Sequence, residues 1–259
     1  MSKIILKKEK KIAIITINRP DVKNALDMET YDEFANALEE VKADSEIRVI
    51  VISGAGDSFC TGIDLKFAGT LKNMSPRELT ALIKRLQAIF RFEDIEKPVV
   101  SAVNGYAMGN GCDIAVASDF VIAADDALLG MAYTNLGLIP DLGGTFRLPR
   151  LVGLSKAREL ILTGENINAE EALRIGMLNK VVPVESLMDE AIKFAGKLAK
   201  RAPIALSMAK TAINKGLSSD LSTAQDFEAY IQNICLQSRD VAEAVSAFLE
   251  KRSPNFKGE

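Results

Sequence analysis

The stretch of sequence that decides the fold is VVSAVNGYAMGNGCDIAVA, residues 99–117. It begins with residues 99–103, a short and almost entirely apolar run of the kind that forms buried strands. Residues 104–111 follow with three glycines, which let a backbone turn sharply and approach a ligand closely. A helix is predicted from about Gly111 to Ala117, and its first N–H groups lie unpaired at the positive end of the helix dipole. The stretch therefore predicts a strand, a tight turn and a helix whose N-terminus faces a ligand site.

Strands and helices alternate along most of the chain around this stretch. Runs of β-branched and apolar residues predict strands, and apolar residues at helical spacing predict helices. The predicted strands cover residues 4–7, 12–17, 49–52, 99–103, 120–123 and 181–182. The predicted helices cover residues 28–41, 76–92 and 111–117, and another begins near residue 145. Such alternation is typical of an α/β protein.

Only helices are predicted after the last of these strands. They cover residues 186–200, 203–215, 221–236 and 241–251. A chain of 259 residues has room for one large domain with an appendage. We therefore expect an α/β core over residues 1–200 and a helical C-terminal region over residues 201–259.

The sequence contains no histidine and no tryptophan. The absence of histidine excludes Ser-His-Asp and Cys-His catalysis, histidine-ligated zinc and any imidazole base. If the protein is an enzyme, its chemistry must come from carboxylates, backbone N–H groups, lysines or tyrosines. We predict no metal site.

Charge and cysteine content narrow the possible partners and the compartment. The formal net charge is −3, whereas general nucleic-acid binders carry a basic field. Three cysteines do not make a disulfide framework, so a reducing compartment is expected. No apolar run approaches the ~20 residues of a membrane span, and the N-terminus lacks a signal-peptide pattern. We therefore expect a cytoplasmic protein that binds neither nucleic acid nor membranes.

A second glycine-containing loop, FCTGIDL at residues 59–65, also follows a predicted buried strand. Two backbone N–H groups aimed at one point form an oxyanion hole, which stabilises a negatively charged oxygen. Neither this loop nor residues 104–111 fits the dinucleotide pattern G-x-G-x-x-G or the phosphate-loop pattern. The alternative interpretation is that both loops are ordinary connections after strands.

Several motifs, in order and spacing, resemble those of the crotonase (enoyl-CoA hydratase/isomerase) family, and the resemblance covers essentially the whole chain. The motifs are NRP at 18–20, KNAL at 23–26, the segments 59–65 and 97–113, GLIPDLGG at 137–144, LTG at 162–164 and KRSP at 251–254. Within the family, residues 136–150 and 246–258 are most similar to the enoyl-CoA isomerases that act on aromatic-derived substrates, the ring-1,2-epoxyphenylacetyl-CoA isomerases.

This resemblance implies an enzyme that acts on acyl-CoA thioesters. Its fold would be a spiral of ββα units with a helical C-terminal region that forms a homotrimer or a dimer of trimers. The thioester oxygen would be held by the backbone N–H groups of Ile63 and Asn110, although the family usually has glycine at the second position. The resemblance implies no cofactor besides the coenzyme A of the substrate.

The resemblance also indicates which side chains carry the chemistry. Family hydratases use two glutamates; Asp113 takes the place of the first, and Tyr133 takes the place of the second. Asp141 stands where hydratases usually have glycine and where several isomerases have an acid. Moving a proton between two carbons needs only one base, so an isomerase with Asp141 as its proton shuttle is the leading prediction.

Three alternatives stay open at this stage. A hydratase or dehydratase would use Asp113 and Asp141 as a pair. A dehalogenase would attack the substrate through Asp141, but family dehalogenases also use a histidine and a tryptophan, which this chain lacks. A catalytically silent member would bind coenzyme A without reaction. Asp141 would then be only a turn residue or helix cap, Asp113 would balance a helix dipole, and Tyr133 would be a wall of the pocket.

The resemblance further implies that loop residues and the C-terminal tail bind coenzyme A. Lys23, Lys66 and Lys257 are candidate partners for its phosphates. In the family, the tail near Phe256 often reaches the coenzyme A of a neighbouring subunit. The full set of predicted contacts is Lys23, Ala25, Leu26, Thr61, Asp64, Leu65, Lys66, Phe256 and Lys257.

Overall fold

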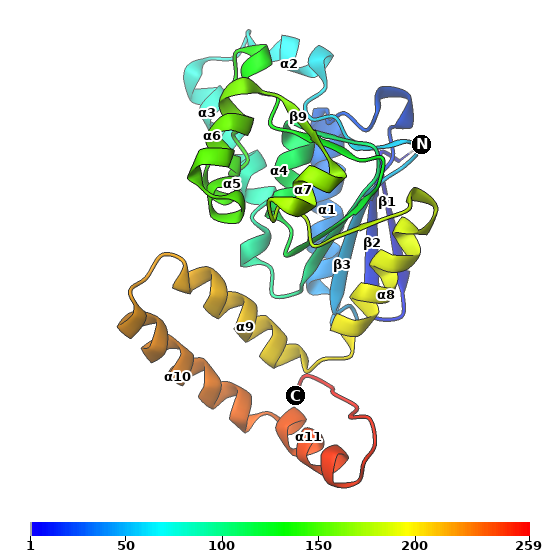
Figure 1. Cartoon of the computed structure of the whole chain (residues 1–259), viewed down its shortest axis with the longest axis vertical. Coiled ribbons are helices and arrows are strands. Elements are labelled where there is room, and N and C mark those ends of the chain that lie inside the picture. Colours follow the sequence, from blue (N-terminus) through cyan, green and yellow to red (C-terminus); the bar gives the residue numbers. More distant parts are fainter. Residues whose placement is uncertain (1) are drawn as a thin grey trace.

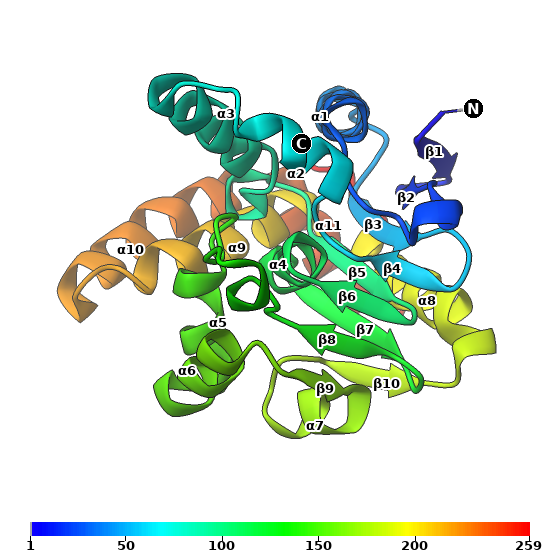
Figure 2. The same ribbon diagram turned by 90° about the horizontal axis from the view of Figure 1, so that it is seen from above.

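A six-stranded sheet lies at the centre of the protein (Figures 1 and 2). The computed structural model describes residues 2–259. In spatial order the strands are β1 (Ile4–Glu9), β2 (Ile12–Ile17), β3 (Val49–Gly54), β5 (Val99–Val103), β7 (Phe120–Ala124) and β10 (Lys180–Val182). β1 pairs antiparallel with β2, and every other neighbouring pair in this sheet is parallel. The α/β class is therefore confirmed.

A smaller sheet adds four short strands beside the first. They are β4 (Ser58–Cys60), β6 (Tyr106–Met108), β8 (Leu128–Gly130) and β9 (Asn166–Asn168). Three times along the chain, a strand of the large sheet is followed by one of the small sheet and then by a helix. This repeat is the ββα spiral that the resemblance implied. The short strands themselves were not predicted, because three residues are too few to show a pattern of alternation.

Helices pack around the two sheets. α1 (Met28–Ala43) begins after Asp27, whose side chain accepts a hydrogen bond from the Thr30 N–H. α3 (Pro76–Ile89) begins with a capping box between Ser75 and Glu78. The other helices of this part are α2 (Leu65–Leu71), α4 (Asn110–Ala117), α5 (Gly144–Val152), α6 (Leu154–Thr163), α7 (Ala169–Arg174) and α8 (Leu187–Ala199). Single turns of 3-10 helix cover Pro20–Val22, Phe92–Asp94, Thr134–Leu136 and Val184–Ser186.

Some predicted boundaries were wrong, and three helices were missed. The strand predicted over 4–7 extends to Glu9, because its residues pair with β2 as far as Ile12. The helix predicted over 76–92 ends at Ile89, and the chain continues into the 3-10 turn. The helices α2, α6 and α7 were not predicted.

The inner strands of the large sheet, β2, β3, β5 and β7, are buried on both faces. On one face, their side chains pack against α8, where Leu187, Ala191, Ala195 and Ala199 form one stripe at four-residue spacing. On the other face, a larger core includes aromatic side chains such as Phe34, which packs against Phe90. Burial on both faces explains why the parallel strands are continuous apolar runs in the sequence.

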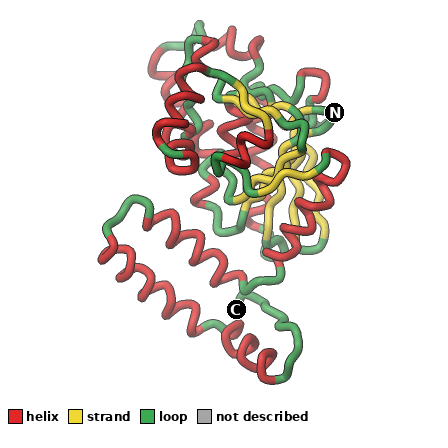
Figure 3. The backbone as a smooth tube through the Cα atoms, in the orientation of Figure 1, coloured by secondary structure: helices red, strands yellow, loops and turns green. Residues whose placement is uncertain are grey.

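The last three helices extend away from this body (Figures 1 and 3). They are α9 (Pro203–Gly216), α10 (Leu221–Gln237) and α11 (Arg239–Leu249). A largely buried ion pair between Lys210 Nζ and Asp119 Oδ2, at 2.7 Å, joins α9 to the core. Large apolar side chains stay exposed on these helices: Ile213, Leu221, Tyr230, Leu236, Val245, Phe248 and Leu249. Over residues 2–259, none of the helices combines the length and the apolar character needed to cross a membrane.

Candidate active site

A cavity of about 480 Å³ lies where the two glycine-containing loops meet. Its walls are formed by residues from the segments 19–25, 61–66, 108–110 and 132–138. The first loop follows β4, and the second contains β6 and leads into α4. The two loops that the sequence predicted to face a ligand therefore share one cavity.

The backbone N–H of Ile63 is free to bind a ligand in this cavity. Leu26 forms a parallel bridge with Ile63: the Leu26 N–H donates to the Gly62 carbonyl at 2.7 Å, and the Leu26 carbonyl accepts from the Asp64 N–H at 2.9 Å. Because successive peptide groups of an extended segment point to opposite sides, the Ile63 N–H points away from Leu26. No acceptor for it lies within the described residues, and Ile63 lines the cavity.

The backbone N–H of Asn110 comes from the adjoining loop. Asn110 is the first residue of α4, where N–H groups have no acceptor inside the helix. Gly62 lies directly against this helix start, with φ at +93°, and a methyl group placed on it would be 3.3 Å from the Asn110 nitrogen. Glycine at position 62 thus allows the two loops to approach. The residues that carry these two N–H groups, Ile63 and Asn110, both line the cavity.

Asp113 is a completely buried carboxyl group on α4. Its Oδ2 accepts hydrogen bonds from the Tyr133 hydroxyl and, at 3.2 Å, from the Leu142 N–H. Its Oδ1 has no partner among residues 2–259 and faces Gly144, where an added methyl group would lie 2.0 Å away. Burial raises the pKa of Asp113 to about 6, although both hydrogen bonds oppose the rise. Tyr133 lines the cavity, whereas Asp113 does not.

Ionisation of Asp113 is expected to destabilise the fold. Its folded-state pKa of about 6 lies above the ordinary value of 3.8, so the folded protein binds more protons than the unfolded chain between these pH values. Stability is therefore lost as the pH rises through this window. The variant Asp113→Asn stays neutral, and its free energy of unfolding should gain on the order of 3 kcal/mol relative to wild type between about pH 4 and pH 7. Urea denaturation of both proteins measures this, and a difference independent of pH would contradict it.

Asp141 is partly exposed, in contrast to Asp113. Its Oδ1 accepts a hydrogen bond from Asn110 Nδ2 at 3.3 Å, and its backbone carbonyl accepts one from Gln87 Nε2 at 2.8 Å. Burial raises the pKa of Asp141, and the hydrogen bonds to its carboxylate, one of them from Asn110, oppose the rise. Since Leu142 contacts Asp113, the structure brings Asp113, Tyr133 and Asp141 together around the start of α4.

The predicted coenzyme A contacts fall into three groups. Ala25, Thr61, Asp64, Leu65 and Lys66 line the cavity. Leu26 is buried behind them, and Lys23 is exposed with its Nζ 4.4 Å from the centre of the Tyr106 ring. The tail residues do not line the cavity within this chain: the Phe256 carbonyl accepts from Arg48 at 2.6 Å, and the Lys257 N–H donates to Asp240 at 2.7 Å.

Several cavity residues were missed at the level of sequence. Met108, Ala132, Leu136 and Leu138 contribute to its walls, but isolated apolar residues in short strands and turns carry no distinctive signal. Arg19 also lines the cavity. Its position in the NRP motif marked Arg19 as a family residue, but the sequence did not show which groups its side chain contacts.

Comparisons with known proteins identify the family of the chain. A sequence model of the enoyl-CoA hydratase/isomerase family matches residues 7–259. The chain is 44% identical to a crotonyl-CoA hydratase of Syntrophomonas wolfei, over 98% of this chain and 97% of that protein. It is 39% identical to a 1,2-epoxyphenylacetyl-CoA isomerase of Escherichia coli, over 96% of each. The crystal structure of an enoyl-CoA hydratase from Bacillus anthracis is similar with a TM-score of 0.94 and 37% identity, over 99% of this chain and 100% of that one. The chain therefore belongs to the enoyl-CoA hydratase/isomerase family, also called the crotonase family, and is an enzyme of that family.

Proposed function

We propose that the protein is an enoyl-CoA double-bond isomerase in which a single carboxylate, Asp141, moves the proton. The observation that supports this most is the different setting of the two candidate acids. Asp113 is completely buried and bonded to Tyr133 and Leu142, and neither Asp113 nor Asp141 is among the residues that line the cavity. Asp141 is partly exposed beside Asn110. One accessible carboxylate is enough for isomerisation, whereas hydration needs groups that both activate water and protonate carbon.

In the proposed reaction, the N–H groups of Ile63 and Asn110 hold the thioester oxygen of a 3-enoyl-CoA. Asp141 removes a proton from the carbon next to the thioester, and the electrons move onto the oxygen to form an enolate. The double bond then shifts into conjugation as Asp141 returns the proton two carbons along the chain. No atom is gained or lost, and no cofactor is needed besides the coenzyme A of the substrate.

Tyr133 and Asp113 have supporting roles in this proposal. Tyr133 forms a wall of the cavity, and its hydroxyl donates to the Asp113 carboxylate. Asp113 also accepts from the Leu142 N–H, next to Asp141. Asp113 thus positions both the Tyr133 ring and the loop that carries the proton shuttle.

A hydratase is the second candidate, and two observations favour it. The relatives at 44% and 42% identity are named crotonyl-CoA hydratase and short-chain-enoyl-CoA hydratase. In addition, the pKa of Asp113 near 6 would suit a second acid-base group. A catalytically silent coenzyme A-binding protein is the third candidate.

Two substrates distinguish these candidates. The isomerase should convert a 3-enoyl-CoA to the conjugated 2-enoyl-CoA, which raises the absorbance of the conjugated thioester. A hydratase should instead remove the absorbance of added 2-enoyl-CoA. Rapid loss of that absorbance would contradict the isomerase proposal, and no reaction with acyl-CoAs of straight-chain, alicyclic and aromatic type would support the silent alternative.

We further propose that the protein works in the cytoplasm as a homotrimer or a dimer of trimers. The exposed apolar side chains of α9, α10 and α11 support the assembly, because such a surface favours burial against other copies of the chain. In the assembly, Phe256 and Lys257 of one subunit would reach the coenzyme A bound to its neighbour. Sedimentation equilibrium should give the mass of three or six chains, and the mass of one chain would contradict the proposal.

A further inference from the structure

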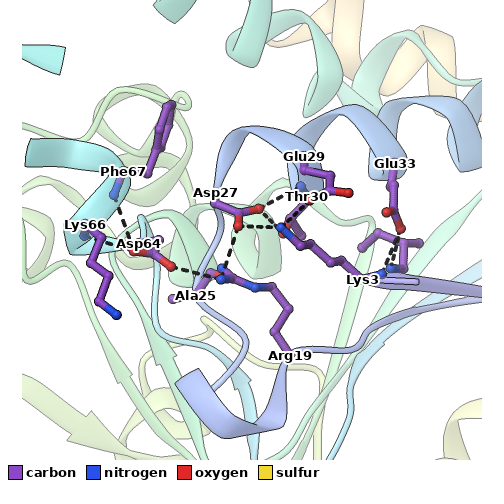
Figure 4. A network of polar contacts seen from close by, with 11 residues as sticks. Lys3, Arg19, Ala25, Asp27, Glu29, Thr30, Glu33, Asp64, Lys66 and Phe67 are labelled. Atoms are coloured by element: carbon purple, nitrogen blue, oxygen red, sulfur yellow. Dashed lines mark hydrogen bonds and ion pairs between the residues drawn. The ribbon is translucent and has the colours of Figure 1, made fainter. Parts of the chain in front are cut away.

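We infer that Arg19 is a positioning residue whose guanidinium group fixes the peptide that presents the Ile63 N–H to the cavity. The inference rests on the proposed role of Ile63 in the oxyanion hole and goes beyond it, since it explains what keeps that N–H in place. Arg19 lies in the network of polar contacts shown in Figure 4.

The Arg19 guanidinium contacts three acceptors from two segments of the chain, residues 25–27 and Asp64. Its Nη1 donates to the Ala25 carbonyl. Its Nη2 donates to Asp64 Oδ2 at 3.0 Å and lies 3.1 Å from Asp27 Oδ2. The side chains of Arg19 and Asp64 are only 16% and 12% exposed, so water competes weakly for this ion pair. A planar guanidinium can satisfy several acceptors in a fixed geometry.

The carboxylates of Asp64 and Asp27 each accept a further hydrogen bond through their other oxygen, Oδ1. Asp64 Oδ1 accepts from the Lys66 N–H at 2.9 Å and so caps α2. Asp27 Oδ1 accepts from the Thr30 N–H at 2.9 Å and so caps α1. Burial opposes the ionisation of Asp64, but the hydrogen bonds from Arg19 and from the α2 backbone lower its pKa. Arg19 therefore connects the starts of two helices.

These contacts enclose the oxyanion peptide on both sides. Ala25 precedes Leu26, and Asp64 follows Ile63, while Leu26 and Ile63 form the parallel bridge. Arg19 thus holds both segments of the bridge at adjoining residues. If the guanidinium is removed, the segment 61–64 keeps its backbone hydrogen bonds to residues 23–26 but loses the side-chain contact that holds Asp64.

The backbone of Arg19 is itself held firmly. Its N–H donates to Asn24 Oδ1 at 2.8 Å, and its carbonyl accepts from the Asn24 N–H at 2.9 Å. Asn24 is completely buried, and its Nδ2 donates to the carbonyl of Ser58, the first residue of β4, at 2.6 Å. The backbone of Arg19 is therefore fixed close to the loop 59–65, which its guanidinium contacts at Asp64.

The test compares the binding of two ligands. One forms an enolate whose oxygen can accept from the Ile63 N–H, and the other has no carbonyl group that could reach this N–H. Acetoacetyl-CoA is a stable β-ketothioester that forms an enolate with its own ultraviolet band, and coenzyme A lacks the acyl group. For Arg19→Met, we expect the Kd of coenzyme A to change far less than the affinity for the acetoacetyl-CoA enolate. The affinity for the acetoacetyl-CoA enolate and kcat should each fall about 100-fold, as displacement of a reacting group by about 1 Å would cause.

Two further variants separate positioning from a loss of stability. Arg19→Lys keeps the charge but not the forked geometry, so it should recover only part of the enolate affinity. Lys210→Met removes an equally buried ion pair that lies away from the cavity, with the Lys210 side chain 8% exposed. It should lower the melting temperature without changing the ratio of the two affinities.

A double variant tests whether Arg19 acts through Asp64. Asp64→Asn keeps an oxygen that can cap α2 but weakens the pair with Arg19. If both residues act through one contact, Arg19→Met combined with Asp64→Asn should lose no more enolate affinity than Arg19→Met alone. Losses that multiply would contradict action through Asp64.

The inference and the proposed function fail in different ways. Wild-type affinity ratios in Arg19→Met and Arg19→Lys, or equal losses for both ligands, would overturn the inference and leave the proposed function intact. A wild-type protein that binds neither ligand would contradict the proposed function and the inference with it.

Discussion

Replacing Asp141 by asparagine is expected to lower kcat for isomerisation of a 3-enoyl-CoA by about 1,000-fold. Asparagine has nearly the same shape and keeps an oxygen that can accept from Asn110 Nδ2, but it cannot take up and return a proton. The affinity for coenzyme A should change little, because Asp141 is not among the residues that line the cavity between the two glycine-containing loops. Steady-state kinetics with the variant, together with the Kd of coenzyme A, measures both effects.

A matched control for this substitution is Asp126→Asn. Asp126 is an exposed residue between β7 and β8, so the same chemical change there should leave kcat unaltered. Turnover near the wild-type rate in Asp141→Asn on every accepted substrate would rule out the proton shuttle. In that case Asp141 would be a loop residue without a part in catalysis.

The second large effect is expected from Gly111→Ala, in the first turn of α4. An alanine Cβ at this position would lie 2.0 Å from the Cys60 carbonyl oxygen, which is backbone and cannot rotate away. The helix must therefore move from β4, and the Asn110 N–H moves with it. We expect a loss of about 3 kcal/mol in the free energy of unfolding and a fall of about 100-fold in kcat.

The control for this change is Gly196→Ala in α8. A Cβ at Gly196 would meet no atom within 4 Å, so alanine should stabilise the helix by about 0.5–1 kcal/mol. Urea denaturation gives the free energy for both variants, and kinetics gives kcat. A Gly111→Ala protein with wild-type stability and turnover would contradict the close contact between α4 and β4.

The inner strands of the large sheet could be predicted from the sequence because they are buried on both faces. Val99–Val103 and Val49–Gly54 form almost continuous apolar runs. Such runs can be recognised in the sequence without knowledge of what the strands pack against. The small sheet could not be predicted. Its strands are three residues long and are held by pairing between distant segments, such as Tyr106 with Leu128. Local sequence contains no trace of that pairing.

The candidate site was predictable where backbone motifs define it and not where side chains meet across the fold. The glycine pattern indicated both loops and, with the resemblance, the N–H groups of Ile63 and Asn110. The contact between Asp113 and Tyr133 joins residues 20 positions apart, and burial of the pair depends on Leu142 and Gly144. Arg19 and Asp64 lie 45 positions apart. Such pairs depend on the completed fold.

The most direct test of the isomerase proposal is the mass of the product formed in water enriched in oxygen-18. Wild-type protein is incubated with a 3-enoyl-CoA and, separately, with the corresponding 2-enoyl-CoA, and the acyl-CoAs are analysed by mass spectrometry. Isomerisation through Asp141 and the Ile63 and Asn110 N–H groups predicts a product of unchanged oxygen content from the 3-enoyl-CoA. A product that has gained one molecule of labelled water, as the main product from the 2-enoyl-CoA, would contradict the proposal and identify a hydratase.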